Sequence, residues 1–587
     1  MAAAAPEHPR YEADEKPPLL SSLGYGLQFS LIASATLLVT PVIVANAADR
    51  GGSYVTWMVF ASLVVVGLST IIQVRRLGFV GAGAVLPMFT AAFAIPFCIT
   101  ALVDGGPATL TTLVIVSAIV QLIVSRWLFI LRRFVTPTVG GTVMMILSIT
   151  LASVVFDLLD EATSADPEEA SLTALATMVV AAALMLRGSA FLRFWGPLVG
   201  IVVGCIVAGG LGIFDTGRIT AANWVGIPSE SPGLRLDFSV DFWTLVPAFL
   251  FLGVIIAIQA NGAAIAMQRV AWRDNRAVSF RQVQGAVAGA GASNLLAGLA
   301  GTVPNAVNPA MVSFTQITGV AARRVGYFIG AILIIVAFLP KVSAVLSSIP
   351  GPVMTGYLIM VTGALFVEGA RTVIQNEQSQ EKIAVAGVCF WIAASFQFEL
   401  FHLPDIGAVG NALLKSGITT GGLAAIVMIL YLELTNPRRM RFQSQLNVDA
   451  LPDLNEFITR FARRRNWGSA MQERLTAVAE ETLLTLAPLD LSLGGDDEDE
   501  EKPKDERQLV VLASSEGTTA DLEFIGGGAG ANLEDQIRQI QEHDSLTAVE
   551  EELSLVLLRS YAESVTHQQY HDTDIIAVRV VPPEGDS

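Results

Sequence analysis

Long apolar stretches separated by short polar connections fill the chain from about residue 19 to residue 434. An α-helix that crosses a bilayer needs about 20 mostly apolar residues, and roughly 14 segments have this character, several of them shorter than a full span. The pattern predicts a polytopic α-helical membrane protein. The segments cover residues 27–47, 57–74, 80–98, 109–130, 137–156, 172–186, 195–213, 242–264, 282–299, 305–317, 326–339, 353–366, 383–398 and 420–432.

Arginine is unevenly distributed over the connections between these segments. If the N-terminus is cytoplasmic, nearly every arginine cluster falls on the cytoplasmic side, and Arg218 and Arg235, which share one outer loop, are the main exceptions. Positively charged residues of membrane proteins stay in the cytoplasm, so the pattern predicts that both termini are cytoplasmic. The clusters lie at 75–76, 132–133, 187–193, 269–276, 323–324 and 438–439.

Two of the apolar segments, the third and the tenth, are interrupted by glycine and proline. Residues 81–96 read GAGAVLPMFTAAFAIP, and residues 301–316 read GTVPNAVNPAMVSFTQ. Both residue types disfavour a continuous helix. Interrupted segments at corresponding positions in the two halves of a transporter indicate a binding site at the middle of the membrane. The alternative interpretation is a pair of kinked packing helices.

Composition divides the chain into a membrane part and an acidic tail. The 587 residues are 52% hydrophobic and only 15% charged, whereas a soluble domain has about 25% charged residues. The net charge of −17 comes largely from the tail, which includes the acidic run 496–501, and it does not indicate a nucleic-acid partner. We expect a polar cytoplasmic segment at 1–18, a transporter domain at 19–436 and a cytoplasmic α/β domain at 437–587.

The cysteines and the N-terminal residues add no further site. Cys98, Cys205 and Cys389 lie inside apolar runs, without the spacing of a disulfide framework or a metal site, so we expect no metal and no cofactor. Residues 1–18 contain acids and bases and are not followed by a short apolar stretch with a cleavage site. We therefore expect no removable signal peptide.

Several strings, taken in order, resemble the nucleobase–ascorbate transporter family, of the uracil–xanthine permease type. They include GYGLQFSLIASATLLVTPVIVA from residue 24, FVTPTVGGTVMMILSITL from residue 134 and FLPKVSAVLSSIPGPVMTGYLIMVTG from residue 338. The resemblance implies a seven-plus-seven inverted repeat divided into a core and a gate domain. It also implies elevator-type transport, a homodimer formed through the gate domain, and a transporter rather than an enzyme.

The resemblance places a substrate site on the eighth helix, but the residues found there differ from those of the family and change the chemistry of the site. The family carries a substrate-binding Glu on its eighth helix in a pattern like E-x-x-G-D; here Gln259 replaces the Glu and Ala263 replaces the Asp, with Asn261 between them. Gln28 occupies the family's Gln–His site on the first helix, with Phe29 in place of the His. Thr90, on the interrupted third element, completes this part of the expected site.

The tenth element allows two alignments with the family signature. Counting without gaps places Ala310 and Ser313 in the signature, whereas a shifted alignment uses Asn308, with Thr315 at the family's Thr. Both alignments leave the site without its two carboxylates. Amide side chains can read a neutral planar ring by paired hydrogen bonds, or a small anion together with two half-helix N-termini. Amides that join helices, or that cap a broken helix, are the alternative interpretation.

The tail changes to amphipathic helices and strands. We expect helices at 454–464, 470–486 and 547–566, and strands at 508–513, 520–525 and 574–581. The order resembles the histidine-kinase-like ATPase fold of bacterial anti-sigma factors. The resemblance places Glu480 or Glu481 in the first nucleotide box and Gly526 and Gly528 in a glycine run, but the magnesium-binding Asn and the Asp of the second box are missing. It implies an inactive regulatory domain that binds a cytoplasmic protein; an unrelated α/β module is the alternative.

The favoured function is secondary transport of a nucleobase, a purine such as xanthine or urate, or uracil, or of a related flat heterocycle across the inner membrane. One alternative is a small-anion carrier of the same fold, for sulfate or bicarbonate. Another is a membrane sensor that binds a ligand and signals through the tail. A tail ATPase or kinase is disfavoured by the missing Asn and Asp.

Overall fold

The computed structural model describes residues 9–582 with internal gaps. The chain forms two compact units, of which the first comprises Met1–Asp274 and Gln282–Tyr431 and the second comprises Asn275–Arg281 and Leu432–Ser587. Within the range 9–582 the description omits residues 49, 51, 129–136, 164–166, 215–216, 229–230, 232, 275, 309, 377–379, 399, 402–416, 436–438, 487–507, 517–518, 527–532, 534–557, 559 and 571–572.

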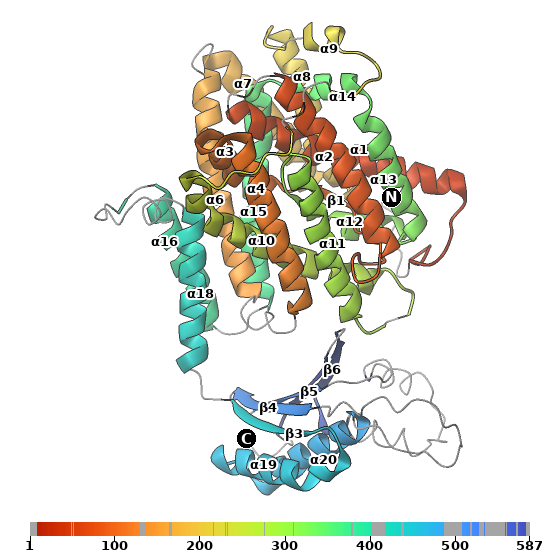
Figure 1. Cartoon of the computed structure of the whole chain (residues 1–587), viewed down its shortest axis with the longest axis vertical. Helices are drawn as coiled ribbons and strands as arrows, with labels where there is room; N and C mark the ends of the chain where they lie inside the picture. Colours follow the sequence, from red (N-terminus) through yellow and green to blue (C-terminus); the bar gives the residue numbers. More distant parts are fainter. Residues whose placement is uncertain are drawn as a thin grey trace. The chain divides into compact units, whose positions relative to one another are not determined.

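The first unit is built of helices (Figure 1). Many are apolar on every side rather than along one stripe, as expected of helices surrounded by lipid and by other helices. In chain order they are α1 (Leu19–Ala47), α2 (Gly52–Arg75), α3 (Ile95–Asp104), α4 (Gly106–Arg126), α6 (Pro137–Thr163), α7 (Pro167–Arg187), α8 (Ala190–Gly210), α9 (Gly217–Ala221), α10 (Val240–Val270), α11 (Phe280–Leu299), α12 (Ala310–Thr318), α13 (Arg323–Ala337), α14 (Pro340–Ser347), α15 (Gly351–Asn376), α16 (Gln380–Gln397) and α18 (Gly417–Thr435).

Among the described residues, 5 helices are long and apolar enough to cross a membrane, namely α2, α4, α7, α10 and α15. A sixth span results if α13 and α14, which are bent by 82° at their junction, are taken together. Shorter or partly described helices coincide with the other expected segments. The chain is therefore a helical, multi-pass membrane protein, and the full seven-plus-seven repeat stays a prediction.

The two interrupted segments combine a short strand with a half-length helix. The third contains β1 (Met88–Thr90), the 3-10 turn η1 (Ala92–Ala94) and α3, and the tenth contains β2 (Asn305–Val307) and α12. Pro96 lies at the start of α3, where proline is tolerated because the first N–H groups of a helix have no partner inside it. The glycine and proline pattern thus correctly indicates where the helices break.

The helices of the first unit pack in two groups. In one group α2 contacts α1 and α13, and α10 contacts α4, α3, β2 and α12. In the other, α15 contacts α6, α7 and α8, and α16 contacts α6. Both interrupted elements belong to the first group, whose main contacts with the second group run through α1, η1, α3 and α10.

Both groups contain a crossing at which two glycines meet. Gly67 of α2 lies against Gly330 of α13, and Gly141 of α6 lies against Gly369 of α15. A Cβ atom on any of the four would lie 2.6 Å from the carbonyl oxygen of its partner. The backbones can approach this closely only because neither helix has a side chain there.

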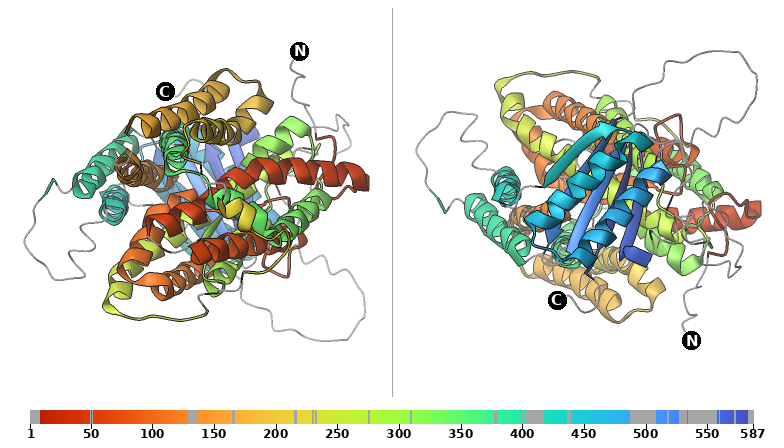
Figure 2. Two further views of the ribbon diagram at one scale, coloured as in Figure 1. Left: turned by 90° about the horizontal axis from the view of Figure 1, so that it is seen from above. Right: turned by 90° about the horizontal axis from the view of Figure 1, so that it is seen from below.

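The second unit is an antiparallel sheet with helices on one face. The strand order is β3-β4-β5-β7-β6, and every neighbouring pair is antiparallel. Figure 2 shows α19 and α20 lying across the sheet. The bounds are β3 (Met440–Gln445), η2 (Val448–Ala450), α19 (Leu451–Arg464), α20 (Ser469–Leu486), β4 (Gln508–Glu516), β5 (Thr519–Gly526), β6 (Ser564–Gln569) and β7 (Asp574–Val580).

The core of this unit follows from its sequence pattern. Leu454, Phe457, Ile458 and Phe461 recur at helical spacing in α19 and are buried, and alternate residues of β5 are buried. The apolar stripe of the helix, which repeats about every 3.6 residues, therefore packs on the sheet face formed by every second residue of the strand. The helices expected at 454–464 and 470–486 and the strands expected at 508–513, 520–525 and 574–581 are confirmed.

Two edge strands differ from the sequence prediction. The helix expected at 547–566 is wrong at its end, because Ser564–Gln569 forms β6; residues 547–557 lie outside the described part of the chain. β3 was not expected at all. Both strands lie at the two edges of the sheet and are rich in polar residues, so backbone pairing with β7 and β4, rather than an apolar alternation, makes them strands.

Candidate functional site

A two-stranded antiparallel ladder joins the third and tenth elements. Thr90 of β1 lies opposite Asn305 of β2, and beyond this pair the N–H of Ala91 donates to the carbonyl of Pro304 at 2.9 Å. All residues of both strands are buried. The Thr90 hydroxyl donates to the carbonyl of Leu37 in α1 at 3.0 Å. Non-helical backbone inside a membrane must be satisfied by protein, and the ladder supplies those hydrogen bonds.

A half-length helix follows each strand. α3 begins at Ile95 and α12 begins at Ala310. The helix dipole makes this end of a helix partially positive. In α3 the N–H of Ile95 already donates to the carbonyl of Ala92 in η1, and Pro96 has no N–H, so this end contributes its dipole rather than those two donors. The two interrupted elements therefore bring two helix N-termini close to a shared strand pair, which is an arrangement suited to carbonyl oxygens or other electronegative ligand atoms.

Gln259 is the predicted site residue with an unsatisfied polar atom. It lies in α10, the helix that contacts α3, β2 and α12. Its side chain is half-buried, and its Oε1 atom is buried with no hydrogen-bond partner among the residues that the structure describes. A buried acceptor without a partner is costly, and a ligand that donates a hydrogen bond relieves this cost.

Asn261 does not share the face of Gln259. It is also half-buried, but residues two apart in an α-helix point to nearly opposite sides. Ala263, four residues after Gln259, does share that face and is buried. At the position where the resemblance places an Asp, this helix offers only a methyl group beside Gln259.

The first helix contributes an aromatic side chain where the resemblance places a His. Phe29 of α1 is fully buried. Its ring centroid lies 5.8 Å from that of Phe89 in β1 and 5.2 Å from that of Phe314 in α12, both in edge-to-face geometry. Such pairs are favourable beyond the area that they bury. Gln28, the preceding residue, is half-buried.

The residues that the two alignments of the tenth element offer differ in their burial and in their contacts. Asn308 is half-buried, and its backbone N–H donates to the carbonyl of Pro87 beside β1 at 3.1 Å. Ala310 begins α12, whereas Ser313 is exposed. Thr315 is buried. Of the residues that the two alignments offer, Asn308 is the one whose backbone N–H bonds to the third element, directly after the β1–β2 ladder.

A buried amide network behind the ladder was missed by sequence reasoning. The Nδ2 of Asn294 in α11 donates to the Oε1 of Gln121 in α4 at 2.9 Å and to the carbonyl of Asn305 at 2.8 Å. The N–H of Asn305 donates back to the Oδ1 of Asn294 at 2.5 Å. All three side chains are fully buried. The network fixes the start of β2 relative to α4 and α11.

Gln73 in α2 has a similar role on the other side of the ladder. Its Nε2 donates to the carbonyl of Ala286 in α11 at 2.9 Å, and its Oε1 accepts from the N–H of Ala82 at 3.0 Å. This residue therefore anchors the loop that leads into β1. The sequence signal for Gln73 and Gln121 was a single amide in an otherwise apolar helix, whereas Asn294 shares α11 with Gln282 and Gln284.

The site elements contain almost no acid. Apart from Asp241 in the first turn of α10, no Asp or Glu occurs in α1, β1, α3 before its last residue, α10, α11, β2 or α12. Neutral amides, backbone groups and aromatic rings are therefore the main groups that these elements offer to a ligand.

The tail residues assigned to a nucleotide site are only partly described. Glu480 in α20 accepts a hydrogen bond from the Nδ2 of Asn455 in α19, and Glu481 is half-buried. Gly526 ends β5 opposite Asp574, whereas Gly528 lies outside the described residues. The carboxylate of Glu480 is thus held by the neighbouring helix.

Sequence comparison decides the family. The model of the permease family Xan_ur_permease matches residues 20–399. The chain belongs to this permease family. It is a transporter rather than an enzyme, and a multi-pass inner-membrane protein.

Three named relatives match between 70% and 74% of the chain. A Clostridium perfringens (strain 13 / Type A) protein, whose name proposes a purine permease, is 28% identical over 74% of this chain and 95% of its own length. The xanthine permease XanQ of Escherichia coli (strain K12) is 26% identical over 72% and 93%. The uric acid permease PucK of Bacillus subtilis (strain 168) is 23% identical over 70% and 95%.

Solved structures give a weaker likeness. The transmembrane domain of the cyanobacterium bicarbonate transporter BicA is 16% identical, with 72% of this chain and 100% of that chain covered and a TM-score of 0.45. The overall structure of SLC26A9 is 13% identical, with coverages of 81% and 78% and a TM-score of 0.46. At these TM-scores neither likeness carries an argument about substrate.

Proposed function

We propose that this permease carries a nucleobase, a purine such as xanthine or urate, or uracil, or a related flat heterocycle. The observation that carries the proposal is the buried, unpartnered Oε1 of Gln259 on the helix that contacts both interrupted elements. The edge of a nucleobase presents ring N–H groups beside carbonyl oxygens. An amide oxygen accepts from the N–H group, and the partially positive N-terminal ends of α3 and α12 attract the carbonyl oxygens.

The names of the relatives support the same substrate class. XanQ is named for xanthine and PucK for uric acid, and both are flat heterocycles with N–H and carbonyl groups on one edge. An anion carrier would need compensating positive charge or several converging donors. The Gln259 amide offers an acceptor beside donors, which matches a neutral ring edge with N–H and carbonyl groups better than a small anion, which can use only the donors. The nucleobase is therefore the better fit.

The proposed transport step moves one helix group against the other. The group that contains α1, α3, α10 and α12 corresponds to the expected core domain, and the group around α6 and α15 corresponds to the expected gate domain. We propose an elevator-type motion in which the core carries the substrate site, with dimerisation through the gate. The second unit is proposed to be a cytoplasmic regulatory domain that binds a protein partner and hydrolyses no ATP.

Uptake by the purified protein tests the proposed substrate. Proteoliposomes would be given labelled xanthine, urate, uracil, sulfate and bicarbonate in separate reactions, with protein-free liposomes as the control. We expect saturable uptake of at least one nucleobase, abolished by an excess of the same unlabelled compound. Saturable uptake of sulfate or bicarbonate alone contradicts the proposal and favours the anion carrier.

A further inference from the structure

The N-terminal residues form an ordered strap across two turns of the first unit. Tyr11 pairs with Val320 as a parallel bridge. The N–H of Tyr11 donates to the carbonyl of Gly319, and the N–H of Ala321 donates to the carbonyl of Tyr11, each at 2.9 Å. The N–H of Arg323 donates to the carbonyl of Ala13 at 3.0 Å. The strap, defined as residues 9–18, thus lies along the turn between α12 and α13.

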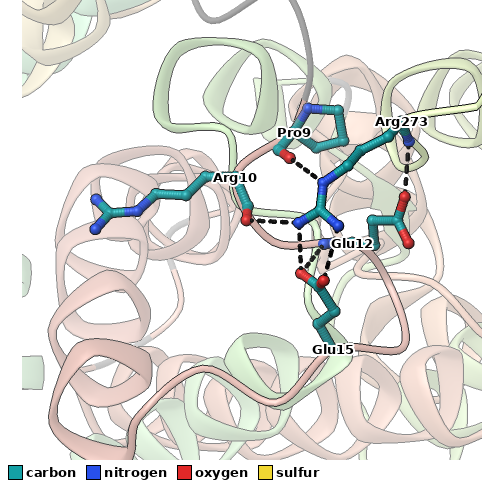
Figure 3. Close-up of polar contacts among 5 residues, drawn as sticks. All are labelled: Pro9, Arg10, Glu12, Glu15 and Arg273. Atoms are coloured by element: carbon teal, nitrogen blue, oxygen red, sulfur yellow. Dashed lines mark hydrogen bonds and ion pairs between the residues drawn. The ribbon is translucent and has the colours of Figure 1, made fainter.

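Arg273 holds the same strap from the end of α10. Its guanidinium donates to both carboxylate oxygens of Glu15, at 2.9 and 3.0 Å, and to the carbonyls of Pro9 and Arg10, at 3.2 and 3.0 Å. The N–H of Arg273 donates to the Oε1 of Glu12 at 2.9 Å. Figure 3 shows these groups around the guanidinium. A planar guanidinium that donates to a carboxylate through two nitrogens fixes its partner's orientation as well as its distance.

A small apolar contact closes the space beneath the strap. Ala13 is buried against Ala271 from the end of α10 and Ala321 from the α12–α13 turn, with Trp272 packed alongside. Arg323 adds an ion pair with Asp14 at 2.6 Å and donates to the carbonyl of Gly83, which precedes β1. The strap therefore contacts the ends of the helices that carry Gln259 and the tenth element, and it reaches the loop before the third element through Arg323.

We propose that residues 9–18 are a positioning strap, which couples the end of α10 to the α12–α13 turn and so fixes the distance between Gln259 and the tenth element. The inference about substrate affinity rests on the proposed function, whereas the coupling itself does not. Arg273 and Glu15 are positioning residues, since they lie outside the ladder and act through the helices that they join.

Amide hydrogen exchange of the ligand-free protein tests the coupling without any substrate. The hydrogen bonds described for Arg273 go to the strap and not to the α12–α13 turn. We nevertheless expect Arg273→Glu to speed exchange at Ala321 and Arg323, because their N–H groups donate to strap carbonyls. Glu15→Arg should do the same. The double variant Glu15→Arg/Arg273→Glu restores the charge pair and should exchange more slowly than either single variant. The matched control is Glu456→Arg, which breaks the exposed Glu456–Arg460 ion pair on α19.

Nucleobase uptake by the same variants tests the positioning role. We expect KM to rise at least three-fold in each single variant, to recover partly in the double variant and to be unchanged in the control. Unchanged exchange at Ala321 and Arg323 in both single variants and in a deletion of residues 1–16 overturns the strap. If the deletion variant does not fold, the two single variants decide alone. Altered exchange with an unchanged KM overturns the positioning role. If the parent chain takes up no nucleobase, the proposed function is refuted, but the exchange result remains valid.

Discussion

At the residue scale, amides in otherwise apolar segments supply much of the polar chemistry of the transporter. Asn294, Gln121 and Gln73 make hydrogen bonds that fix the backbone around the ladder. Among the described residues, Nε2 of Gln121 and Oε1 of Gln259 are buried without a partner, and of these two atoms the oxygen of Gln259 is the acceptor. Sequence alone marked Gln259, because a family position could be matched to it. It could not rank the other amides, since hydrogen bonding between distant segments depends on packing that periodicity does not encode.

Gln259→Glu should make binding depend on pH. Burial disfavours the charged form of a carboxyl and raises its pKa above the usual value of about 4.3. A ring N–H donates more strongly to a carboxylate than to a neutral carboxyl, so we expect affinity to be higher above the raised pKa and to fall as pH drops through it. Among the described residues of β1, β2, α12 and of α10 beyond its first turn, no Asp, Glu or His occurs that could change charge between about pH 5 and 8.

Isothermal titration at a series of pH values checks this expectation, using a nucleobase that stays neutral over the range. The parent protein is the control, and its affinity should be constant. A pH dependence in the parent equal to that of Gln259→Glu would show that another group titrates at the site.

The Glu15–Arg273 pair should make the stability of the strap depend on pH. The hydrogen bond from Arg273 lowers the pKa of Glu15 below its ordinary value. A carboxylate with a lowered pKa stabilises the folded state above its ordinary pKa, and this contribution is lost as pH falls through the lowered value. The strap is thus intact at neutral pH. Both side chains are partly exposed, at 44% for Arg273 and 38% for Glu15, so salt should weaken the pair.

At the element scale, the breaks in the membrane helices could be predicted from the sequence, whereas the two edge strands of the tail's sheet could not. Glycine and proline mark positions where any helix is disfavoured, so the third and tenth elements were evident from sequence. β3 and β6 are made by pairing with β4 and β7, and their own residues are largely polar. The strap was missed for the same reason, because its short polar segment is ordered by backbone bonds to a distant turn.

The glycine crossing of α6 and α15 gives a direct test of the packing. Gly369→Ala places a Cβ 2.6 Å from the carbonyl oxygen of Gly141, and we expect it to destabilise the protein by roughly 1–3 kcal/mol, as overpacking does. Gly363→Ala is the matched control on the same helix, since a Cβ there meets nothing within 4 Å. Thermal melting in detergent measures both variants. Equal melting temperatures for the two would contradict the close crossing.

At the scale of the whole molecule, the chain combines a permease with a separate small sheet domain. The family covers residues 20–399, which include the ladder, α10 and the strap's docking turn, and it does not cover the second unit. Transport is therefore assigned to the first unit. The proposed regulatory role of the second unit rests on its order of elements and on the resemblance of α20 to a nucleotide box, in which Glu480 accepts a hydrogen bond from Asn455.

The affinity of Gln259→Ala for the transported nucleobase, measured by isothermal titration beside Asn261→Ala, tests the substrate site most directly. The two residues lie on the same helix, are both half-buried and point to different sides. Loss of the Gln259 acceptor leaves a ligand N–H unpaired, so we expect a cost of about 1–3 kcal/mol, or about 5- to 150-fold weaker binding. Asn261→Ala should bind like the parent. Parent-like affinity in a folded Gln259→Ala protein would contradict the proposed site, and equal losses in both variants would assign the effect to helix packing.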